Sequence, residues 1–467
     1  MAATFGIDFG TTNSLITVIR KNAATSQFEP FSFFEDNFLP HPSVVWYQGG
    51  QPIVGRAARD RLTTLRLGVI DDIVRSPKMF LGSSFGIPVG GITRSAADVV
   101  GDVLKHLRKH AKSSGHEDNE FASAVITIPI HMSGPARAEL REAALKAGIH
   151  IHQFVHEPLA ALYGYLRPRP DFRQELARLE GRLVLVFDWG GGTLDLTLCQ
   201  LRKGVLTQVM NEGDQEVGGD KFDLRLRQLI RQKHEACYPS ADWSRLKPQV
   251  DARLLTVCED TKILLSSRKS WKVFIPDFFL AANDESTLAV TITAMEFETA
   301  VEDLVRNGLD RIAKLLDTAG VPHGAIEYCL ATGGMVSMPA IQRGLLDIFG
   351  MSGLRLVPNA SSVISEGAAW IAHDRNGLRL AKPLELLNAD NTYVEIIPAG
   401  TNLPTEGGAI EKRIDAYCVD PSDGLAKIQI ARPTWPGRHS QSDQRVPYTH
   451  LCVPVDTTKR LFTDRLS

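Results

Sequence analysis

The chain has 467 residues, of which 43% are hydrophobic and 23% are charged. This length suggests roughly three domain-sized units, and the hydrophobic fraction supports packed cores, which excludes a disordered chain. Lys and Arg together number 52 and Asp and Glu 54, so the formal net charge is −2. The composition therefore lacks the basic excess of a nucleic-acid-binding protein. No apolar run approaches the roughly 18 residues that a membrane helix needs.

Cysteine usage and the N-terminal residues indicate a cellular compartment. Six cysteines are scattered singly and none forms a C-x-x-C pair, so neither a disulfide framework nor a zinc ribbon is expected. Free thiols are typical of a reducing environment, and the first residues lack the basic-then-apolar pattern of a secretory leader. We therefore expect a soluble cytoplasmic protein.

The first predicted element is a hairpin whose turn carries an acid, glycine and hydroxyl residues. Thr4–Phe9 and Ser14–Arg20 read as two strands joined by the turn Asp8-Phe9-Gly10-Thr11-Thr12-Asn13. A helix is predicted over Pro135–Ala147, because proline is favoured in a first turn and Gly148 follows the last apolar position.

A second hairpin repeats the first one far along the chain. Leu183–Phe187 is apolar and ends in the turn Asp188-Trp189-Gly190-Gly191-Gly192-Thr193, after which leucines alternate with polar residues from Leu194 onward. This alternation is the period of a half-buried strand. Asp8 and Asp188 lie 180 residues apart, about the size of one α/β lobe, so the sequence predicts an internal duplication.

The second half of the chain continues with helices and one more glycine turn. Thr293-Ala-Met-Glu296 is a capping box that begins a helix predicted to run through Leu316 and to stop near Gly320. Thr332-Gly333-Gly334 then follows an apolar run and precedes a helix from about Pro339, an arrangement that can bring a ligand close to the backbone. Strands that alternate with such helices indicate an α/β architecture.

The tail after about Pro383 has a different character. Proline and glycine recur, and short alternating runs at Tyr393–Ile397, Ala416–Val419 and Ala426–Ile430 predict a small β unit. A long helix is not expected here, because several prolines would interrupt it.

The composition of the two hairpin turns indicates what they bind. Glycines let backbone amides approach a ligand closely, and consecutive amides form an anion cradle. The aspartates would repel a phosphate, so their presence implies a cation between acid and anion. Magnesium prefers carboxylate and water oxygens and bridges to nucleotide phosphates. Two acid-tipped turns that face each other therefore predict a site for a triphosphate and its metal.

These motifs resemble those of the 70-kilodalton heat-shock chaperones, the DnaK-like group of the actin-like ATPase superfamily. Residues 6–14 match the first phosphate motif of this family and Asp188–Asp195 the second, while Glu157-Pro-Leu-Ala-Ala161 matches the connecting segment. Gly218–Asp223 matches the G-G-x-x-F-D motif and Thr332-Gly333-Gly334 the adenosine motif. The order of the motifs along the chain is also that of the family.

The resemblance implies an α/β fold: a duplicated actin-like, ribonuclease H-like ATPase domain of two lobes, followed by a small, mostly-β C-terminal domain. The ATPase domain would span residues 1–376, with lobe I at about 1–182 and lobe II at about 183–376. Residues 377–387 would form the interdomain linker, and 388–467 a reduced β domain similar to a substrate-binding domain.

The resemblance also implies roles for individual residues. Asp8 and Asp188 would hold Mg²⁺ through its waters, and Glu157 and Asp195 would complete the acidic ring. Lys78 would orient the attacking water and stabilise charge on the γ-phosphate as ATP is hydrolysed to ADP. The other members of the site would be the catalytic Thr193 and the nucleotide-binding residues Gly10, Thr11, Thr12, Asn13, Gly190, Gly191, Gly192, Gly218, Gly219, Glu259, Lys262, Ser266, Gly333, Gly334 and Ser337.

The sequence departs from the family at several places, among them Ser337, the segment Asn359-Ala360-Ser361-Ser362 where relatives carry N-P-D-E, and the linker. One of its motifs also has a second interpretation. Ser337 stands where relatives carry an arginine that stacks on adenine, so we expect weaker nucleotide binding. The linker keeps a P-L-x-L core at Pro383–Leu386 but lacks the acid that relatives carry. Glu259, Lys262 and Ser266 match the helix that lines the nucleoside, although their spacing also suits surface ion pairs along one helix face.

Three classes of function are compatible with the sequence. The leading hypothesis is a monomeric, ATP-dependent chaperone that binds unfolded peptide or protein clients and works with a J-domain co-chaperone and a nucleotide exchange factor. The lack of room for a helical lid favours a second class, an actin-like ATPase that regulates or scaffolds one dedicated partner. A sugar or acid kinase is less favoured, because such an enzyme needs an acidic base beside its polyol substrate. Here Lys78 stands at the position that orients the attacking water. Neither nucleic acid nor a membrane is expected as a partner.

Two histidine pairs stand apart from this site. His106 and His110 share a helix face, and His150 and His152 flank one residue. A metal site needs at least a third ligand, so the sequence favours surface or helix-end histidines.

Overall fold

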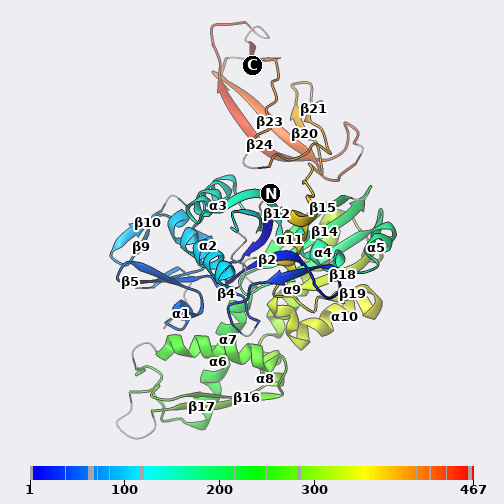
Figure 1. The fold of residues 1–467 in the computed structure, drawn as a ribbon. Coiled ribbons are helices and arrows are strands. Elements are labelled where there is room, and N and C mark those ends of the chain that lie inside the picture. Colours follow the sequence, from blue (N-terminus) through cyan, green and yellow to red (C-terminus); the bar gives the residue numbers. More distant parts are fainter. Residues whose placement is uncertain are drawn as a thin grey trace.

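The fold is a mixed α/β arrangement of several sheets with helices packed against them (Figure 1). It is a computed structural model that describes residues 4–36, 38–61, 68–70, 72–83, 85–114, 120–203, 205–214, 217–247, 250–280, 286–405, 408–419, 422–437, 439–460 and 465–466. Among these residues, no helix combines the length and the apolar character needed to cross a membrane. All six cysteines are free thiols, in agreement with their scattered spacing.

The first sheet is built from the N-terminal hairpin and two further parallel strands. Its order is β12-β11-β1-β2-β3, with β4 paired to β2. β1 runs parallel to β11 and antiparallel to β2. The strands are β1 (Thr4–Phe9), β2 (Asn13–Lys21), β3 (Phe28–Ser32), β4 (His41–Pro42), β11 (Ser123–Ile128) and β12 (His150–His156). The two strands predicted for the N-terminal hairpin are therefore confirmed.

The second sheet repeats the pairing order of the first. Its order is β15-β14-β13-β18-β19, and β13 runs antiparallel to β14 and parallel to β18. The strands are β13 (Leu183–Trp189), β14 (Leu194–Arg202), β15 (Val205–Asp214), β18 (Ile326–Thr332) and β19 (Leu354–Leu356). In both sheets the first hairpin strand is central, with the rest of the hairpin on one side and two parallel strands on the other. The repeat seen in the turns thus extends to the strand order.

Each large sheet has its own apolar core. The first core joins β1 to helices α2 (Ala96–Ser113) and α3 (Gly134–Lys146) through residues such as Phe5 and Leu104, and both of these side chains are fully buried. The second core joins the strand pair β13 and β14 to several helices, and it includes the fully buried Trp189. These helices are α6 (Gly219–Cys237), α7 (Val250–Leu265), α9 (Glu302–Ala319) and α10 (Pro339–Gly353).

Helices α4 (Glu157–Leu166) and α11 (Val363–Asp374) cross at very close range. A Cβ atom at Gly367 would lie 1.8 Å from the carbonyl oxygen of Ala160, and one at Gly164 would lie 2.3 Å from that of Val363. The two backbones therefore touch, which only glycine permits. Because α11 also packs on β1 and β2, this crossing fixes the position of Glu157, the first residue of α4.

The long helix predicted from Thr293 is wrong in one respect, because it is two helices. The capping box at Thr293 and Glu296 is confirmed and begins α8 (Ala294–Ala300). Val301 then leaves the helical conformation, with φ −118° and ψ 11°, before α9 begins. Its β-branched side chain is stiff and fully buried in the second core, so tertiary packing overrides the local helical pattern. The apolar period continues across the break, which is why the sequence did not reveal it.

The remaining elements surround these two sheets. Helices α6 to α8 and the strand pair β16 and β17 lie at one end of the molecule, at the bottom of Figure 1. The elements not yet given are β5 (Val44–Gln48), β6 (Gln51–Val54), α1 (Arg56–Arg59), β7 (Gly68–Ile70), β8 (Ile73–Arg75), a 3₁₀ helix (Pro77–Phe80), β9 (Ile87–Val89), β10 (Ile92–Arg94), α5 (Phe172–Leu179), β16 (Ser270–Ile275), β17 (Leu288–Thr293) and two further 3₁₀ helices (His323–Ala325 and Gly334–Ser337).

The C-terminal residues form a four-stranded antiparallel sheet at the opposite end of the molecule (Figure 1). Its order is β21-β20-β23-β24, and the strands are β20 (Leu384–Leu387), β21 (Tyr393–Ile397), β23 (Leu425–Pro433) and β24 (Arg445–Pro454). A separate two-stranded sheet pairs β22 (Ala416–Tyr417), which lies between β21 and β23 in the chain, with β25 (Arg465–Leu466), which follows β24. No helix follows α11 in the described part of the chain. The last four residues assigned to the linker are thus a strand of this sheet.

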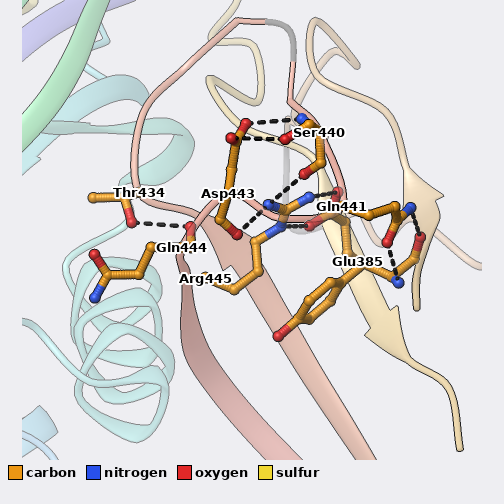
Figure 2. A network of polar contacts seen from close by, with 8 residues as sticks. Glu385, Thr434, Ser440, Gln441, Asp443, Gln444 and Arg445 are labelled. Atoms are coloured by element: carbon orange, nitrogen blue, oxygen red, sulfur yellow. Dashed lines mark hydrogen bonds and ion pairs between the residues drawn. The ribbon is translucent and has the colours of Figure 1, made fainter. Parts of the chain in front are cut away.

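A buried ion pair stabilises the C-terminal sheet (Figure 2). Nε of Arg445 donates to Oε2 of Glu385 at 2.6 Å and Nη2 donates to Oε1 at 3.2 Å. The side chains are only 3% and 8% exposed. Nη1 of the same arginine donates to the carbonyl oxygens of Ser440 and Asp443. Arg445 therefore ties β20, the start of β24 and the loop before it into one unit.

Polar contacts also join this sheet to the second large sheet. Nζ of Lys382 donates to the carbonyl oxygen of Val209 in β15 and to that of Thr434, which follows β23. Nη1 of Arg202, at the end of β14, donates to the carbonyl oxygen of Pro436. Burial lowers the pKa of Lys382 to about 8. The C-terminal sheet is thus hydrogen-bonded to the hairpin that carries the second turn.

Candidate functional site

The two repeated turns lie against each other. A Cβ atom on Gly191, in the turn after β13, would lie 3.3 Å from Oγ1 of Thr12, in the turn after β1. Ser43 braces the first turn, because its backbone N–H donates to the carbonyl oxygen of Thr12 and its hydroxyl donates to that of Gly10. The structure thus brings together two segments that are 180 residues apart in sequence.

Carboxylates from four different elements gather beside these turns. Burial raises the pKa of Asp188 well above its usual value, and the negative charges of Asp195, Glu157 and Asp8 raise it further. Burial also raises the pKa of Asp8 to about 6, with the charge of Glu157 as the second cause. The charges of the four predicted acids therefore influence one another, and Asp188 is also the register partner of Asp195 in the hairpin. We refer to these four residues as the acidic cluster.

Lys78 is placed within this acidic cluster by a short 3₁₀ helix, Pro77–Phe80. Its Nζ donates to Oε1 of Glu157 at 2.9 Å and to the carbonyl oxygen of Phe9 at 2.6 Å. The side chain is 7% exposed. A lysine ammonium has three N–H donors, so two of them fix the side chain and the third is left to act on another group.

Thr127 belongs to the cluster although the sequence analysis missed it. Its Oγ1 donates to Oδ1 of Asp8 at 2.8 Å, which opposes the rise in the pKa of Asp8. β11 pairs with β1, and this brings the hydroxyl to the carboxylate. The signal available in the sequence was one polar residue within the otherwise apolar run Val125–Ile128, and the structure shows that its side chain is fully buried.

The hydroxyl of Thr193 has a partner within the site. Its Oγ1 donates to Oδ2 of Asp195 at 3.0 Å, so in this structure it orients the acid. Thr332 is the register partner of Asp188 in the neighbouring strand, and its buried Oγ1 has no hydrogen-bond partner within the described residues.

The second turn, the Gly218-Gly219 segment and the Gly333-Gly334 turn pack together. A Cβ atom at Gly218 would lie 2.3 Å from the carbonyl carbon of Gly192, and one at Gly333 would lie 2.5 Å from Oδ1 of Asp188. Gly333 also has φ +89°, a conformation that side chains disfavour. A Cβ atom at Gly219 would lie 3.0 Å from Nζ of Lys262. Side chains at Gly218 and Gly333 would clash with the backbone of the second turn, so these three segments pack directly on one another.

The three residues predicted on one helix face have different surroundings. Nζ of Lys262 in α7 lies 2.9 Å from Oδ1 of Asp223 in α6, and both side chains are buried. Burial raises the pKa of Asp223 to about 6, and the charge of Lys262 opposes this. Glu259 pairs with Arg59 of α1 at 3.1 Å, and Ser266, just beyond α7, donates to the carbonyl oxygen of Lys262. The alternative of ion pairs along one helix face is therefore wrong for Glu259 and Lys262, since both pair with residues of other elements.

Ser337 ends the short 3₁₀ helix that follows Gly333. It is exposed, and its hydroxyl donates to the carbonyl oxygen of Gly334 at 2.7 Å. The position therefore carries a short side chain bonded to its own turn, where the family pattern has a long cation.

The residues present fit a divalent cation and a phosphate chain. Four carboxylates and one lysine leave a net negative charge, and hard oxygen donors of this kind suit Mg²⁺. Cβ atoms at Gly192 and Gly334 would meet nothing within 4 Å, so the backbone there faces open space. The first turn is accessible as well, because Thr11 and Thr12 are partly exposed and Asn13 is exposed.

Comparison with known proteins places the chain in a family. A model of the Hsp70 protein family matches residues 82–421. A chaperone protein DnaK from Thermosipho melanesiensis is 27% identical over 436 residues, which cover 91% of this chain and 69% of the relative. A chaperone protein HscA homolog from Methylobacillus flagellatus is 28% identical over 427 residues, which cover 88% of this chain and 63% of the relative.

A further HscA homolog, from Azoarcus sp., is 30% identical over 432 residues, which cover 87% of this chain and 62% of the relative. The chain thus spans less than two thirds of the length of both HscA homologs. Because the family match covers most of the chain, including Glu157, Asp188, Asp195 and the glycines of the second turn, this chain belongs to the Hsp70 protein family.

Proposed function

We propose that the chain is an ATP-dependent chaperone of the DnaK type, which binds and hydrolyses ATP with Mg²⁺ and thereby controls the binding of peptide or protein clients. The observation that carries the proposal is the contact of two repeated turns beside four carboxylates and Lys78. The similar proteins, which are named as chaperones, support the same class of function.

The two large sheets are assigned to the two lobes of an ATPase domain, residues 1–182 and 183–376. Residues 377–383 are assigned to the linker and 384–467 to a reduced client-binding unit, because β20 belongs to the C-terminal sheet. A J-domain protein and a nucleotide exchange factor would be partners of a monomer of this kind. In this assignment both lobes contribute acids to the nucleotide site, which suits control by nucleotide state.

Asp8 and Asp188 would hold Mg²⁺ through its waters, with Glu157 and Asp195 beside them. The metal would supply positive charge that neutralises the phosphate oxygens. Lys78 would use its third N–H to orient a water molecule, since Glu157 and the carbonyl oxygen of Phe9 already hold the ammonium in place. Chemistry of this type depends on positioning and electrostatic stabilisation rather than on a covalent intermediate.

A second candidate function is the regulation or scaffolding of one dedicated partner. The observation that favours it is β24, which stands at the edge of the C-terminal sheet and is exposed along almost its whole length. An edge strand can pair with an extended segment of another protein.

Single-turnover hydrolysis of ATP tests the proposal. Lys78→Ala should bind ATP but hydrolyse it at least about 100-fold more slowly than the wild type. This is the usual loss when one preorganised donor is removed. Lys105→Ala, at an exposed lysine of α2, is the matched control and should hydrolyse ATP like the wild type. Unchanged hydrolysis in Lys78→Ala would contradict the assigned role.

Affinity for a generic hydrophobic peptide separates the two candidates. A chaperone should release a fluorescent peptide when ATP is added, because nucleotide state controls its client site. An unchanged affinity, together with normal ATP hydrolysis, would favour the dedicated-partner function. Addition of small polyols should leave ATP turnover unchanged, and an increase would indicate a kinase.

A further inference from the structure

A second cluster of side chains with metal-binding chemistry lies outside the acidic cluster. Glu35, His41 and His106 each offer one ligand atom, and these atoms lie within 4.8 Å of one another. Glu35 precedes β4, His41 is the first residue of β4 and His106 lies in α2. The sequence pairs His106 with His110 and shows no third ligand beside them, whereas the fold brings two other candidate ligands to His106 from a segment about 70 residues away.

The separations between the ligand atoms suit a tetrahedral ion. Nδ1 of His41 lies 3.1 Å from Nε2 of His106 and 3.9 Å from Oε2 of Glu35, and Nε2 of His106 lies 3.6 Å from Oε1 of Glu35. Zinc–ligand bonds of 2.0–2.1 Å in tetrahedral geometry place neighbouring ligand atoms about 3.3 Å apart. The two oxygens of Glu35 face different nitrogens, and one ligand atom from each residue lies within 4.8 Å of the other two. A modest movement of the Glu35 carboxylate would therefore bring three ligand atoms to one ion.

The neighbouring groups orient the imidazole of His41 and the carboxylate. Nε2 of His41 lies 2.9 Å from the carbonyl oxygen of Phe33, so it carries the proton, and Nδ1 keeps a lone pair directed toward His106. Histidine ligands of metals are commonly held in this way. The backbone N–H of Arg56 lies 3.0 Å from both oxygens of Glu35. A Cβ atom at Gly55 would lie 2.3 Å from Oε1 of Glu35, so glycine is required beside the carboxylate.

The cluster is buried on one side and accessible on the other. His41 is 1% exposed, whereas the side chains of Glu35 and His106 are 15% and 26% exposed. An ion can therefore enter from the side of His106, and water can complete its coordination there. This pattern of three protein ligands with one open position is common for zinc.

We propose that Glu35, His41 and His106 bind one divalent transition-metal ion of the zinc type. Two imidazoles and one carboxylate favour such ions over Mg²⁺ or Ca²⁺, which prefer oxygen ligands. In the metal-free form, Nε2–H of His106 donates to Nδ1 of His41. When the ion binds, the imidazole of His106 carries its proton on Nδ1 instead, so that both Nε2 of His106 and Nδ1 of His41 offer a lone pair. The ion would cross-link the segment before β4 to α2. Ser43, which braces the first turn through Gly10 and Thr12, lies two residues beyond His41.

Calorimetric titration of the metal-stripped, full-length chain with Zn²⁺ tests the site. The buffer contains excess Mg²⁺, which occupies oxygen-rich sites such as the acidic cluster. We expect one Zn²⁺ per chain, and Co²⁺ in its place should give the visible ligand-field bands of a nitrogen-ligated ion. Absence of stoichiometric Zn²⁺ binding would overturn the proposal.

Variants at two histidines of the same helix identify the ligands. His106→Gln should weaken Zn²⁺ binding at least 10-fold and remove the Co²⁺ bands, because it lacks one ligand of three. His110→Gln is the matched control, since Nε2 of His110 lies 3.0 Å from the carbonyl oxygen of Phe34 and His110 is not one of the three ligands, although its ring packs on that of His41 with centroids 4.7 Å apart. It should bind Zn²⁺ within about threefold of the wild type.

Two outcomes would contradict the assigned ligands. Zn²⁺ binding to His106→Gln with wild-type affinity would exclude His106 as a ligand. An equal loss in His110→Gln and His106→Gln would show that the ligand set is different. Circular dichroism of each variant establishes that it is folded, and Glu35→Gln, which retains the size of the side chain, should give the same loss as His106→Gln.

Discussion

Nζ of Lys78 lies 2.9 Å from Oε1 of Glu157, and this contact joins a short 3₁₀ helix to the first residue of α4. The lysine also lowers the pKa of Asp8 and of Asp188, in opposition to burial and to the neighbouring acids. The cation therefore offsets the mutual repulsion of the carboxylates while no metal is bound. It has a structural role in addition to the catalytic role proposed for it.

Lys78→Met should destabilise the chain by about 2–4 kcal/mol at pH 7, because a largely buried acid loses its partner. Adding Glu157→Gln to this variant should recover part of the lost stability, because the glutamine side chain is neutral and leaves no unpaired carboxylate. The free energy of unfolding of the wild type, both single variants and the double variant measures the coupling between the two residues. Additive effects of the two substitutions would contradict a direct interaction.

Asp8→Asn should stabilise the metal-free chain at pH 7.5 although it removes a proposed metal-binding acid. The pKa of Asp8 is about 6 in the folded chain, above its usual value, so a proton binds the folded state more tightly than the unfolded state. The contribution of Asp8 to the free energy of unfolding is therefore unfavourable above pH 6 and becomes less so as the pH falls from about 6 toward 4. A shift of about two pKa units corresponds to about 3 kcal/mol, which solvent screening reduces to about 1–2 kcal/mol.

Thermal unfolding at two pH values checks this prediction. The advantage of Asp8→Asn over the wild type should be present at pH 7.5 and should shrink toward pH 4, where Asp8 itself is protonated. Saturating Mg²⁺ with ADP should remove the advantage by stabilising the wild type more. An advantage that is the same at both pH values would show that the substitution acts through packing.

Ser337→Arg should tighten the binding of ADP about two- to fivefold. The exposed serine bonds to its own turn, and an arginine could instead stack on a base, a contact worth about 0.5–1 kcal/mol at exposed sites. Ser352→Arg, at an exposed position near the end of α10, controls for the added charge. Calorimetric titration of both variants with ADP measures the difference, and equal affinities would place Ser337 away from the base.

Local patterns in the sequence were sufficient for the hairpins and their turns. An apolar run, an acid and several glycines define each turn, and each strand followed within one or two residues of its predicted bounds. The repeat then indicated that the two turns belong to one site. Contact between Thr12 and Gly191 agrees with this expectation, which rested on short-range information alone.

The features that the sequence did not reveal depend on contacts between distant residues. Thr127 reaches Asp8 only because β11 pairs with β1. Glu259 faces Arg59 of α1 because two parts of the chain 200 residues apart come together. The break at Val301 likewise follows from burial in a core that several helices share. Spacing along the chain carries no signal for any of these.

The buried pair of Glu385 and Arg445 leads to a last prediction (Figure 2). Arg445→Met should unfold the C-terminal sheet or destabilise it by about 3–5 kcal/mol, because Glu385 would remain buried without its cation. Hydrogen exchange in β20 and β23 should increase, while ATP hydrolysis should continue. Combining Arg445→Met with Glu385→Leu should restore protection, since neither charge is then buried. If the double variant exchanges as fast as Arg445→Met, the sheet depends on the hydrogen bonds of Arg445 to the loop before β24 and not on the charge pair.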